Sequence, residues 1–284
     1  MKAKTDTRYF RDPALPGIDV CSVSNSRHSF PTHFHDDQYI ISLITSGACR
    51  CVNKGPGDRI TPAGGLTLIN PGQIHSGTPV GQDGLGYTNC FLNLEAMATL
   101  ADTLELTGTG LPEFTDVVIK DPLAAKLLAN LLNTLTAGRD SLEKEAALVS
   151  TFHFLFSRYG EFSPGQDSSG PRHQPVVRAR EILASQLAQK LSLKEVSQRI
   201  GLSQYHFLRT FKRETGMSPH VFRTVKRLER AKQLLKQKVP PAQVALDTGF
   251  TDQSHFTTTF RKFIGATPKQ YQTNHRDVFI QSPP

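Results

Sequence analysis

The chain has 284 residues, of which 38% are hydrophobic and 20% are charged, and these proportions are typical of a soluble globular protein. No apolar run approaches the roughly 18 to 20 residues that a membrane span needs, so a transmembrane protein is excluded. Residues 1–174 hold 14 Lys and Arg against 18 Asp and Glu, whereas residues 175–284 hold 19 against 7. The excess positive charge therefore lies entirely in the second part.

The amino terminus and the cysteines favour a cytoplasmic protein. Residues 1–11 are basic and polar and lack the apolar segment of a secretory signal, so we expect a cytoplasmic location. The four cysteines, Cys21, Cys49, Cys51 and Cys90, lack the paired spacing of a zinc site. We expect reduced thiols packed in a barrel or sheet, and we expect no cofactor.

Residues 1–93 have the composition of β-strands separated by turns that contain Gly or Pro. The predicted strands are 18–24, 39–44, 49–52, 65–70 and 87–92. This pattern predicts an all-β barrel or sandwich.

Three histidines give the predicted barrel its chemical interest. His33 and His35 point to one face if they lie in a strand, and a neighbouring strand could bring His75 beside them. Three imidazoles can bind a metal ion or hydrogen-bond to a polar or anionic ligand, and both alternatives stay open. With Tyr39 and Tyr87, these histidines form the candidate ligand-binding set.

Residues 94–159 contain three predicted helices, at 94–106, 121–137 and 141–159. One face of the second helix collects Leu123, Lys126, Leu127, Asn130 and Leu131, and an apolar stripe on the third collects Leu148, Phe152, Leu155 and Phe156. Such stripes are usually core, and any part that the sheet leaves uncovered would form a homodimer surface. Residues 160–174, rich in Gly, Pro, Ser and Gln, form the predicted linker.

The basic part contains an internal repeat. Residues 196–219 and 244–268 share their Gly, Phe and Pro pattern, and the Phe and Pro positions are offset by 49 residues. In each copy a glycine, Gly201 or Gly249, ends a short helix where the chain must turn sharply. Ser203 or Asp252 then caps a second helix, whose buried face carries the pairs Phe207/Phe211 or Phe256/Phe260. Each copy therefore has the pattern of a helix-turn-helix unit, at about 193–214 and 241–263.

The exposed face of the second helix in each copy suits the major groove of DNA. That face carries Tyr205, Arg209, Lys212 and Arg213 in the first copy and Ser254, Thr258, Arg261 and Lys262 in the second. Arginine hydrogen-bonds to guanine edges, and hydroxyl groups bind bases or phosphates. Two such faces in a strongly basic segment favour double-stranded DNA as the partner over an ordinary solvated surface.

A continuous helix over residues 219–236 is expected to join the two copies. Its outer side is expected to carry Arg223, Lys226, Arg227 and Arg230. Eighteen residues span about 27 Å. Such a spacer could hold the two recognition helices about one DNA turn, roughly 34 Å, apart.

Residues 175–274 closely resemble the DNA-binding domain of the AraC/XylS family. The motifs that carry the resemblance are Gly249-Phe250, His255-Phe256, Phe260-Arg-Lys and Gly265-x-Thr-Pro268. The resemblance implies base contacts from Tyr205, Leu208, Arg209, Gln253, Ser254, Thr257 and Thr258. The expected DNA-binding set further includes Gln204, Lys212, Arg213, Arg261 and Lys262. Leu208 departs from a position that is often polar, and Thr258 from one that is often Arg, so the second unit is expected to bind mainly the DNA backbone.

The front of the chain resembles the cupin barrel in the form that AraC-type regulators use for sensing. His33-x-His35, Gly47 and Pro71-Gly72 followed by His75 carry this resemblance. The carboxylate ligand expected in metal-binding cupins is replaced by Tyr39 or Ile40, so the interpretation assigns no metal and no catalytic residue.

The sequence thus predicts an α+β protein: a cupin-like barrel with following helices, then an all-α domain with two helix-turn-helix units and a tail at 275–284. The expected function is that of a ligand-responsive transcription regulator, which is not an enzyme. Its expected partners are promoter DNA and an unknown small-molecule effector, with RNA polymerase and a second copy of the chain as further candidates. The alternative is a metal-dependent cupin enzyme fused to a DNA-binding domain.

Overall fold

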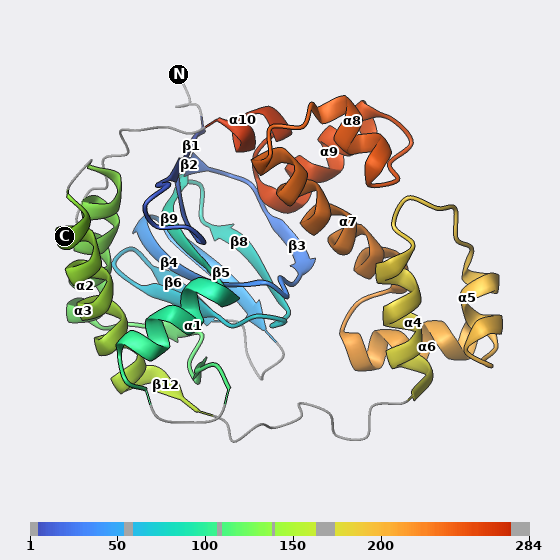
Figure 1. Ribbon diagram of the computed structural model, residues 1–284, viewed down its shortest axis with the longest axis horizontal. Helices are drawn as coiled ribbons and strands as arrows, with labels where there is room; N and C mark the ends of the chain where they lie inside the picture. Colours follow the sequence, from blue (N-terminus) through green and yellow to red (C-terminus); the bar gives the residue numbers. More distant parts are fainter. Residues whose placement is uncertain (1–4, 54–58, 107–109, 138–139, 163–173, 274–284) are drawn as a thin grey trace. The chain divides into compact units, whose positions relative to one another are not determined.

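The computed structural model describes residues 5–53, 59–106, 110–137, 140–162 and 174–273. Its contacts divide the chain into a sheet-rich unit (Met1–Ser29, His35–Gly165 and Thr273–Pro284) and a helical unit (Phe30–Phe34 and Gln166–Gln272) (Figure 1). The predicted α+β class is therefore confirmed. Most of the predicted linker and all of the predicted tail lie outside the described residues. No helix in the described part of the chain is long and apolar enough to cross a bilayer.

Two sheets form the framework of the first unit. The larger sheet is antiparallel, with the strand order β1-β2-β9-β4-β7-β11. Its strands are β1 (Asp6–Arg11), β2 (Ile18–Ser26), β9 (Leu85–Asn93), β4 (Gln38–Ser46), β7 (Leu66–Ile69) and β11 (Val118–Ile119). The second sheet contains β8 (His75–Val80), β5 (Ala48–Asn53) and β6 (Arg59–Pro62) as neighbours in that order. A small ladder pairs β10 (Glu113–Phe114) with β12 (Gly160–Glu161).

One face of the larger sheet packs against three helices. Alternate residues of a strand point to opposite faces. On β4, Tyr39, Ile41 and Leu43 join an apolar cluster with residues of three helices. These helices are α1 (Leu94–Thr103), α2 (Pro122–Thr136) and α3 (Ser141–Tyr159), close to the three predicted segments.

The predicted apolar stripe of α3 is confirmed, whereas that of α2 is wrong. Phe152 and Leu155 are fully buried in the cluster. On α2, in contrast, Leu123 is 51% exposed and the buried face carries Ala124, Ala125, Leu128, Leu131, Leu132 and Leu135. Small alanines allow α2 to lie close against its neighbours, and a stripe chosen for its leucines alone misses that face.

The helical unit contains both predicted helix-turn-helix copies. Its helices are α4 (Gln174–Ser185), α5 (Leu193–Arg199), α6 (Gln204–Thr215), α7 (Pro219–Lys236), α8 (Pro241–Asp247), α9 (Gln253–Ile264) and α10 (Pro268–Gln272). The turns after α5 and α8 contain Gly201 and Gly249 in the left-handed region, with φ of +71° and +78°, as predicted. The joining helix α7 covers the predicted residues.

A short segment from the front of the sequence also belongs to the helical unit. Residues 30–34, which include strand β3 (Phe30–His33), group with α7 and α9. The ring of Phe34 stacks on that of Phe222, with centroids 5.4 Å apart, and the ammonium of Lys226 lies 5.5 Å from the Phe34 centroid. The His33 ring meets the Phe263 ring edge to face at 6.4 Å. This segment therefore forms part of the packing of the helical unit.

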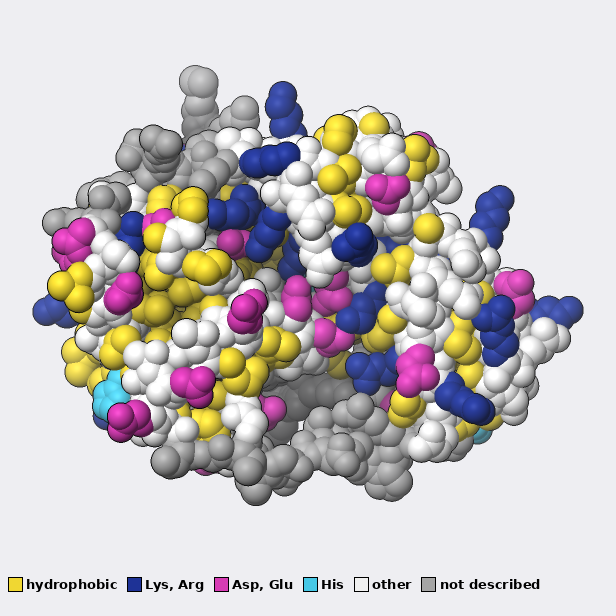
Figure 2. All heavy atoms as spheres, viewed as in Figure 1, with side chains coloured by type: hydrophobic (Ala, Val, Ile, Leu, Met, Phe, Trp, Pro, Cys, Tyr) yellow, Lys and Arg dark blue, Asp and Glu magenta, His cyan; other side chains and the backbone are white. Residues whose placement is uncertain are grey.

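The surface of the helical unit is basic. Figure 2 shows dark blue Lys and Arg side chains standing out from this unit, with few magenta carboxylates among them. Their distribution agrees with the surplus of positive charge in the second part of the sequence. Such a surface attracts phosphate groups, because binding releases the counterions condensed on a nucleic acid.

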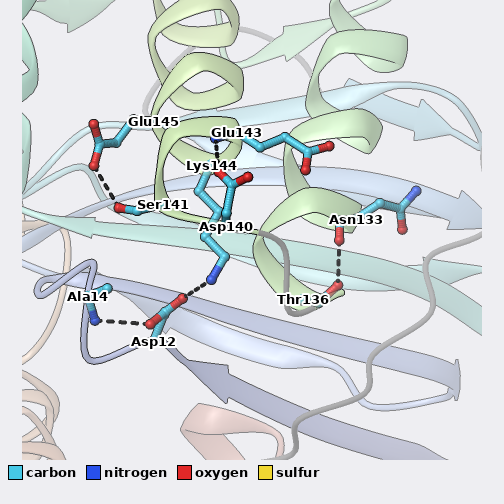
Figure 3. Close-up of polar contacts among 9 residues, drawn as sticks. All are labelled: Asp12, Ala14, Asn133, Thr136, Asp140, Ser141, Glu143, Lys144 and Glu145. Carbon is cyan, nitrogen blue, oxygen red and sulfur yellow. Dashed lines mark hydrogen bonds and ion pairs between the residues drawn. The ribbon is translucent and has the colours of Figure 1, made fainter.

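A nearly buried ion pair ties α3 to the connection that follows β1 (Figure 3). The Lys144 ammonium donates to the Asp12 carboxylate, and the two side chains are only 10% and 14% exposed. This hydrogen bond holds the pKa of Asp12 below its ordinary value. Asp140 caps the start of α3 by accepting from the Glu143 amide at 2.9 Å. The start of the helix is thus fixed by polar contacts as well as by the apolar cluster.

Candidate functional site

Helix α6 presents the first predicted DNA-binding face. The Ser203 hydroxyl caps the helix by accepting from the His206 amide at 3.3 Å, and Gly216 ends it with φ of +70°. Phe207 and Phe211 are fully buried and hold the other side of the helix against the unit. All six residues of the predicted set on this helix are exposed: Gln204, Tyr205, Leu208, Arg209, Lys212 and Arg213.

The exposed face of α6 combines charge with apolar area. Tyr205 is 73% exposed and Leu208 is 38% exposed, so this face offers apolar area beside its charged side chains. Arg209 lies one helical turn from Tyr205 on the same side. Hydrogen-bonding to a base edge and apolar contact with a thymine methyl group are both within the capacity of this face.

Helix α9 repeats this construction with a different exposed face. The Asp252 carboxylate accepts from the His255 amide at 2.8 Å, and Gly265 ends the helix with φ of +81°. Phe256 and Phe260 are fully buried. Of the predicted set, Gln253, Ser254, Thr258, Arg261 and Lys262 are exposed and Thr257 is half-buried. This face carries hydroxyl and amide groups near its start and positive charge only in its last turn.

Two arginines of α7 are less exposed than the sequence predicted. Arg223 and Arg227 were expected on the outer side of this helix, but both are partly buried. The Arg223 guanidinium donates to the carbonyl oxygens of Gln186, at 2.7 Å, and Gln189. Arg227 donates to the Leu187 carbonyl oxygen at 2.9 Å, and burial lowers its pKa to about 10. Both side chains therefore fix the segment after α4, and neither belongs to an exposed DNA-binding face.

The turn of the second helix-turn-helix unit packs against this same segment. A Cβ atom at Gly249 would lie 2.3 Å from the Leu187 carbonyl oxygen and 2.9 Å from a nitrogen of Arg227. Apart from its own chain neighbours, no atom of the described residues lies within 4 Å of the equivalent position at Gly201. Gly249 is thus required both by its backbone conformation and by close packing, and the repeat in the sequence shows only the first reason.

In the sheet-rich unit, the structure brings His35 and His75 together. Their ring centroids are 5.3 Å apart, and both side chains are buried. The Nδ1 atom of His75 lies 2.8 Å from the Gln73 carbonyl oxygen, a contact that requires a proton on Nδ1. Burial lowers the pKa of His75 to about 4, so its ring is neutral near pH 7 and its Nε2 keeps a lone pair.

His33 adds a third imidazole to this pair. Its Nδ1 lies 2.7 Å from the Pro31 carbonyl oxygen, which leaves its Nε2 as the acceptor as well. Ring nitrogens of His33, His35 and His75 all lie within 4.8 Å of one another. Neutral imidazoles whose Nδ1 donates to a backbone carbonyl have the arrangement that orients histidine ligands toward a metal ion. The same nitrogens could hydrogen-bond to a polar effector.

The two tyrosines of the predicted ligand-binding set differ in position. Tyr39 lies on the face of β4 that packs against the helices, and its hydroxyl donates to the Pro112 carbonyl oxygen at 2.8 Å. The structure therefore does not bring Tyr39 to the histidines. Tyr87 is buried, and burial together with the nearby Cys21 and Cys49 thiols raises the pKa of its hydroxyl well above its ordinary value. Tyr87 points toward the interior between the sheets, on the other face from Tyr39.

Comparison with known proteins gives matches for both parts of the chain. Residues 15–152 match the model of the AraC-like ligand binding domain, and residues 178–274 match that of a helix-turn-helix domain. The chain is 33% identical over 255 residues to the uncharacterized HTH-type transcriptional regulator YbfI of Bacillus subtilis, covering 89% of this chain and 90% of YbfI. The chain belongs to the AraC family of transcriptional regulators.

Other proteins are similar to a part or to most of this regulator. A stretch of 87 residues is 37% identical to the multiple antibiotic resistance protein MarA of Escherichia coli, covering 30% of this chain and 68% of MarA. The crystal structure of apo ToxT K231A from Vibrio cholerae has a TM-score of 0.55 at 14% identity, covering 94% of this chain and 96% of ToxT. That likeness shows the same fold. This AraC-family regulator thus combines a ligand-binding domain with a helix-turn-helix DNA-binding domain.

Proposed function

We propose that this AraC-family regulator binds promoter DNA through the exposed faces of α6 and α9 and responds to a small molecule bound at His33, His35 and His75. The exposed face of α6 is the observation that carries the DNA-binding part. It combines Arg209 with the exposed Tyr205 on a helix whose opposite side is fully buried at Phe207 and Phe211. The proposed DNA-binding set is Gln204, Tyr205, Leu208, Arg209, Lys212, Arg213, Gln253, Ser254, Thr257, Thr258, Arg261 and Lys262.

We propose that α6 and α9 have different roles on DNA. Arg209 can make two hydrogen bonds to a guanine, whereas Thr258, at the equivalent position of α9, cannot. The charges of α9, Arg261 and Lys262, lie in its last turn and suit phosphate contacts. Sequence preference is therefore assigned mainly to α6, and α9 mainly positions the DNA backbone.

Replacing Arg209 with alanine tests this assignment. We expect the R209A variant to bind its specific site more weakly by about 1 to 3 kcal/mol and to lose preference at one base pair. The measurement is fluorescence anisotropy at fixed salt with a duplex selected from a random pool by the wild-type protein, compared with a scrambled duplex.

Arg178→Ala is the matched control, because Arg178 is an exposed arginine on α4 outside both recognition helices. This variant loses the same charge and should weaken binding to both duplexes to a similar, small extent. If R209A and R178A have the same effect on the two duplexes, α6 does not carry the sequence preference.

The effector is proposed to bind His33, His35 and His75, with Tyr87 as a further candidate. A buried group of polar side chains inside a ligand-binding domain is the type of site that orients a small ligand. Two ToxT crystal structures are named for complexes with an unsaturated fatty acid and with a naphthalenyl butenoic acid, so carboxylic acids belong in a ligand screen.

A His35→Ala variant tests the effector site. Compounds that raise the melting temperature of the full-length protein are first identified by thermal shift, because ligands that bind the folded state stabilise it. We expect H35A to lose this shift while it keeps its DNA affinity. Tyr39→Phe is the control, because Tyr39 lies on the other face of β4, and this variant should keep the shift. A full shift in H35A would contradict the assignment.

The histidine cluster also supports a second candidate function. Three imidazoles within 4.8 Å can hold a divalent transition metal ion, as in a metal-dependent cupin enzyme fused to a DNA-binding domain. Elemental analysis of the purified protein decides between the two functions. About one metal ion per chain in the wild type, and none in H35A, would favour the enzyme. We propose the regulator without catalysis, because both matching domains belong to transcription regulators.

We further propose that the regulator acts in the cytoplasm, on transcription by RNA polymerase, and as a homodimer. All four cysteines are free thiols, which suits a reducing compartment. Leu123 on α2 and Leu142 on α3 are 51% and 76% exposed, so these two helices offer apolar side chains to a second copy. Sedimentation analysis of the full-length protein and of Leu142→Asp tests the dimer.

A further inference from the structure

Two thiols that the proposed function does not use face each other between the sheets. Cys49 and Cys51 are alternate residues of β5, so their side chains point to the same face. Their Sγ atoms are 3.5 Å apart. The Sγ of Cys51 also lies 3.8 Å from the Thr67 hydroxyl on β7 and 4.0 Å from the Thr61 hydroxyl on β6. Because β7 belongs to the larger sheet, this contact places the sulfur pair in the interior between the two sheets.

Strand geometry disfavours a disulfide between these cysteines. Alternate residues of an extended strand lie about 6.4 to 6.8 Å apart, and their Cβ atoms point in parallel. A disulfide requires Cβ atoms about 3.5 to 4.5 Å apart and sulfurs about 2.05 Å apart. The sulfurs would have to move about 1.5 Å closer than the observed 3.5 Å, and the parallel Cβ atoms would have to converge. The pair is therefore stable as two thiols rather than as a redox switch.

A metal ion between the sulfurs would need them to move apart rather than together. With a metal–thiolate bond of about 2.3 Å, an ion that has only these two ligands in a linear arrangement holds the sulfurs about 4.6 Å apart. The sulfurs would therefore have to separate by about 1.1 Å from the observed 3.5 Å. Rotation of the two side chains can supply this movement, and the strand itself does not have to change.

The number of donors selects the type of ion. Within the described residues, His33, His35 and His75 form the group of three or more side chains that could share a metal ion. Neither Cys49 nor Cys51 belongs to this group. Structural zinc normally needs four ligands. Thiolates favour soft ions such as Cu(I), and a monovalent ion with a filled d shell accepts two ligands.

We propose that Cys49 and Cys51 form a site for one soft, thiophilic metal ion of the Cu(I) class inside the ligand-binding domain. Each thiol exchanges its proton for a bond to the ion, so one Cu(I) and two thiols give an anionic dithiolate complex and two released protons. The Thr61 and Thr67 hydroxyls then donate hydrogen bonds to the bound thiolate of Cys51. This site goes beyond the proposed effector site, because its ligands are sulfurs on β5.

The surroundings of the pair support this chemistry. The Thr61 and Thr67 hydroxyls lie 4.0 Å and 3.8 Å from the Cys51 Sγ, where they can donate hydrogen bonds to a thiolate. Gly77 pairs with Cys51 across the ladder, and His75 lies two residues before Gly77 on the same face. An ion at the sulfur pair would therefore lie on the side of the sheet that carries His75.

Competition for Cu(I) with a chromogenic chelator tests the proposal on the reduced, full-length protein without oxygen. Bathocuproine disulfonate reports the Cu(I) that the protein does not hold. We expect the wild type to take up one Cu(I) per chain, with release of two protons and two sulfur neighbours in the X-ray absorption spectrum. Cys49→Ser and Cys51→Ser should each bind Cu(I) at least about 100-fold more weakly, since even the loss of a supporting group around a metal ligand costs 10- to 100-fold.

Cys90→Ala is the control, because Cys90 is a single buried thiol on the face of β9 that packs toward the helices. This variant and H35A should keep wild-type Cu(I) affinity, and circular dichroism verifies that every variant is folded. The proposal is overturned if C49S or C51S binds Cu(I) as tightly as the wild type, or if C90A weakens binding equally. It is also overturned if H35A loses the ion, because copper would then occupy the histidines. The effector assignment is tested separately, by the thermal shift of H35A with the compounds that stabilise the wild type.

Discussion

Burial gives the side chain of His75 an acid–base behaviour that a histidine in water does not have. The ring is enclosed, its Nδ1 donates to the Gln73 carbonyl oxygen, and its pKa falls from about 6.5 to about 4. The folded protein therefore keeps this ring neutral at a pH at which the unfolded chain has already protonated it. The neutral ring is also the form that can accept a hydrogen bond or bind a metal ion through Nε2.

This shift predicts acid sensitivity of the sheet-rich unit. Because the folded pKa lies below the unfolded one, the contribution of His75 is complete above about pH 6.5 and is lost as the pH falls toward 4. The loss should reach about 2 kcal/mol at pH 5, at 1.36 kcal/mol per unit of pKa difference. Denaturant unfolding at several pH values measures it, and His75→Gln should show a flatter pH profile than the wild type. His153→Gln, which changes an exposed histidine on α3, should keep the wild-type profile; equal profiles for all three proteins would contradict the prediction.

Single residues were predicted from the sequence with mixed success, for a physical reason. The His-x-His pattern and the later His75 predicted three neighbouring imidazoles, because side chains alternate along strands. Tyr39 was misplaced because a strand with two buried faces gives no polar side to identify. Arg223 and Arg227 were expected to be exposed, since nothing in the sequence shows which carbonyl oxygens need a donor.

At the scale of elements, the two helix-turn-helix units share a sequence pattern but not an environment. Both turns place a glycine in the left-handed region. The turn at Gly201 is open, whereas Gly249 lies against the backbone of Leu187. The second turn is therefore a packing contact inside the helical unit as well as a change of chain direction.

Alanine substitutions at the two glycines should separate these roles. Gly201→Ala introduces only the cost of a left-handed backbone, about 1 to 2 kcal/mol. Gly249→Ala adds a clash with the Leu187 carbonyl oxygen and should cost roughly 1 to 3 kcal/mol more, the usual range for overpacking. Thermal unfolding of the full-length variants measures the difference. Equal melting temperatures for the two variants would show that the contact at Leu187 is not formed in solution.

Elements were predicted better than the faces that they bury. The caps at Ser203 and Asp252 and the Phe pairs fixed the limits of α6 and α9, because capping and helical periodicity are local. The inward face of α2 was predicted from its leucines and was wrong, because the sheet selects that face through close contacts of Ala124 and Ala125. The spacing of α6 and α9 on DNA stays a prediction.

At the scale of the whole molecule, the division of the structure does not follow the order of the sequence. Residues 30–34 come from the front part but pack with α7 and α9 of the helical unit. Phe34 is buried against Phe222, and it directly precedes His35 of the proposed effector site. Nothing in the sequence marks residues 30–34 as part of the helical unit, because a single aromatic residue near a strand is as compatible with a barrel core as with a helix contact.

A Phe34→Ala variant tests the role of this segment. Removing the ring leaves Phe222 without its stacking partner, and a buried Phe→Ala change costs about 3 to 5 kcal/mol. We expect the helical unit to lose stability and DNA affinity to fall, although no DNA contact is removed. Hydrogen exchange of the α7 amides measures this effect. Thr32→Ala, an exposed change in the same segment, should leave exchange unaltered; unchanged exchange in F34A would remove the segment from the helical unit.

The packing of residues 30–34 in the helical unit has a consequence for protein engineering. Hybrid regulators are commonly designed by joining the sensor of one protein to the DNA-binding half of another at the linker. In this chain such a cut would separate Phe34 from Phe222 and leave a foreign residue, or a cavity, beside α7. A functional chimera would need to carry residues 30–34 along with the helices that they complete.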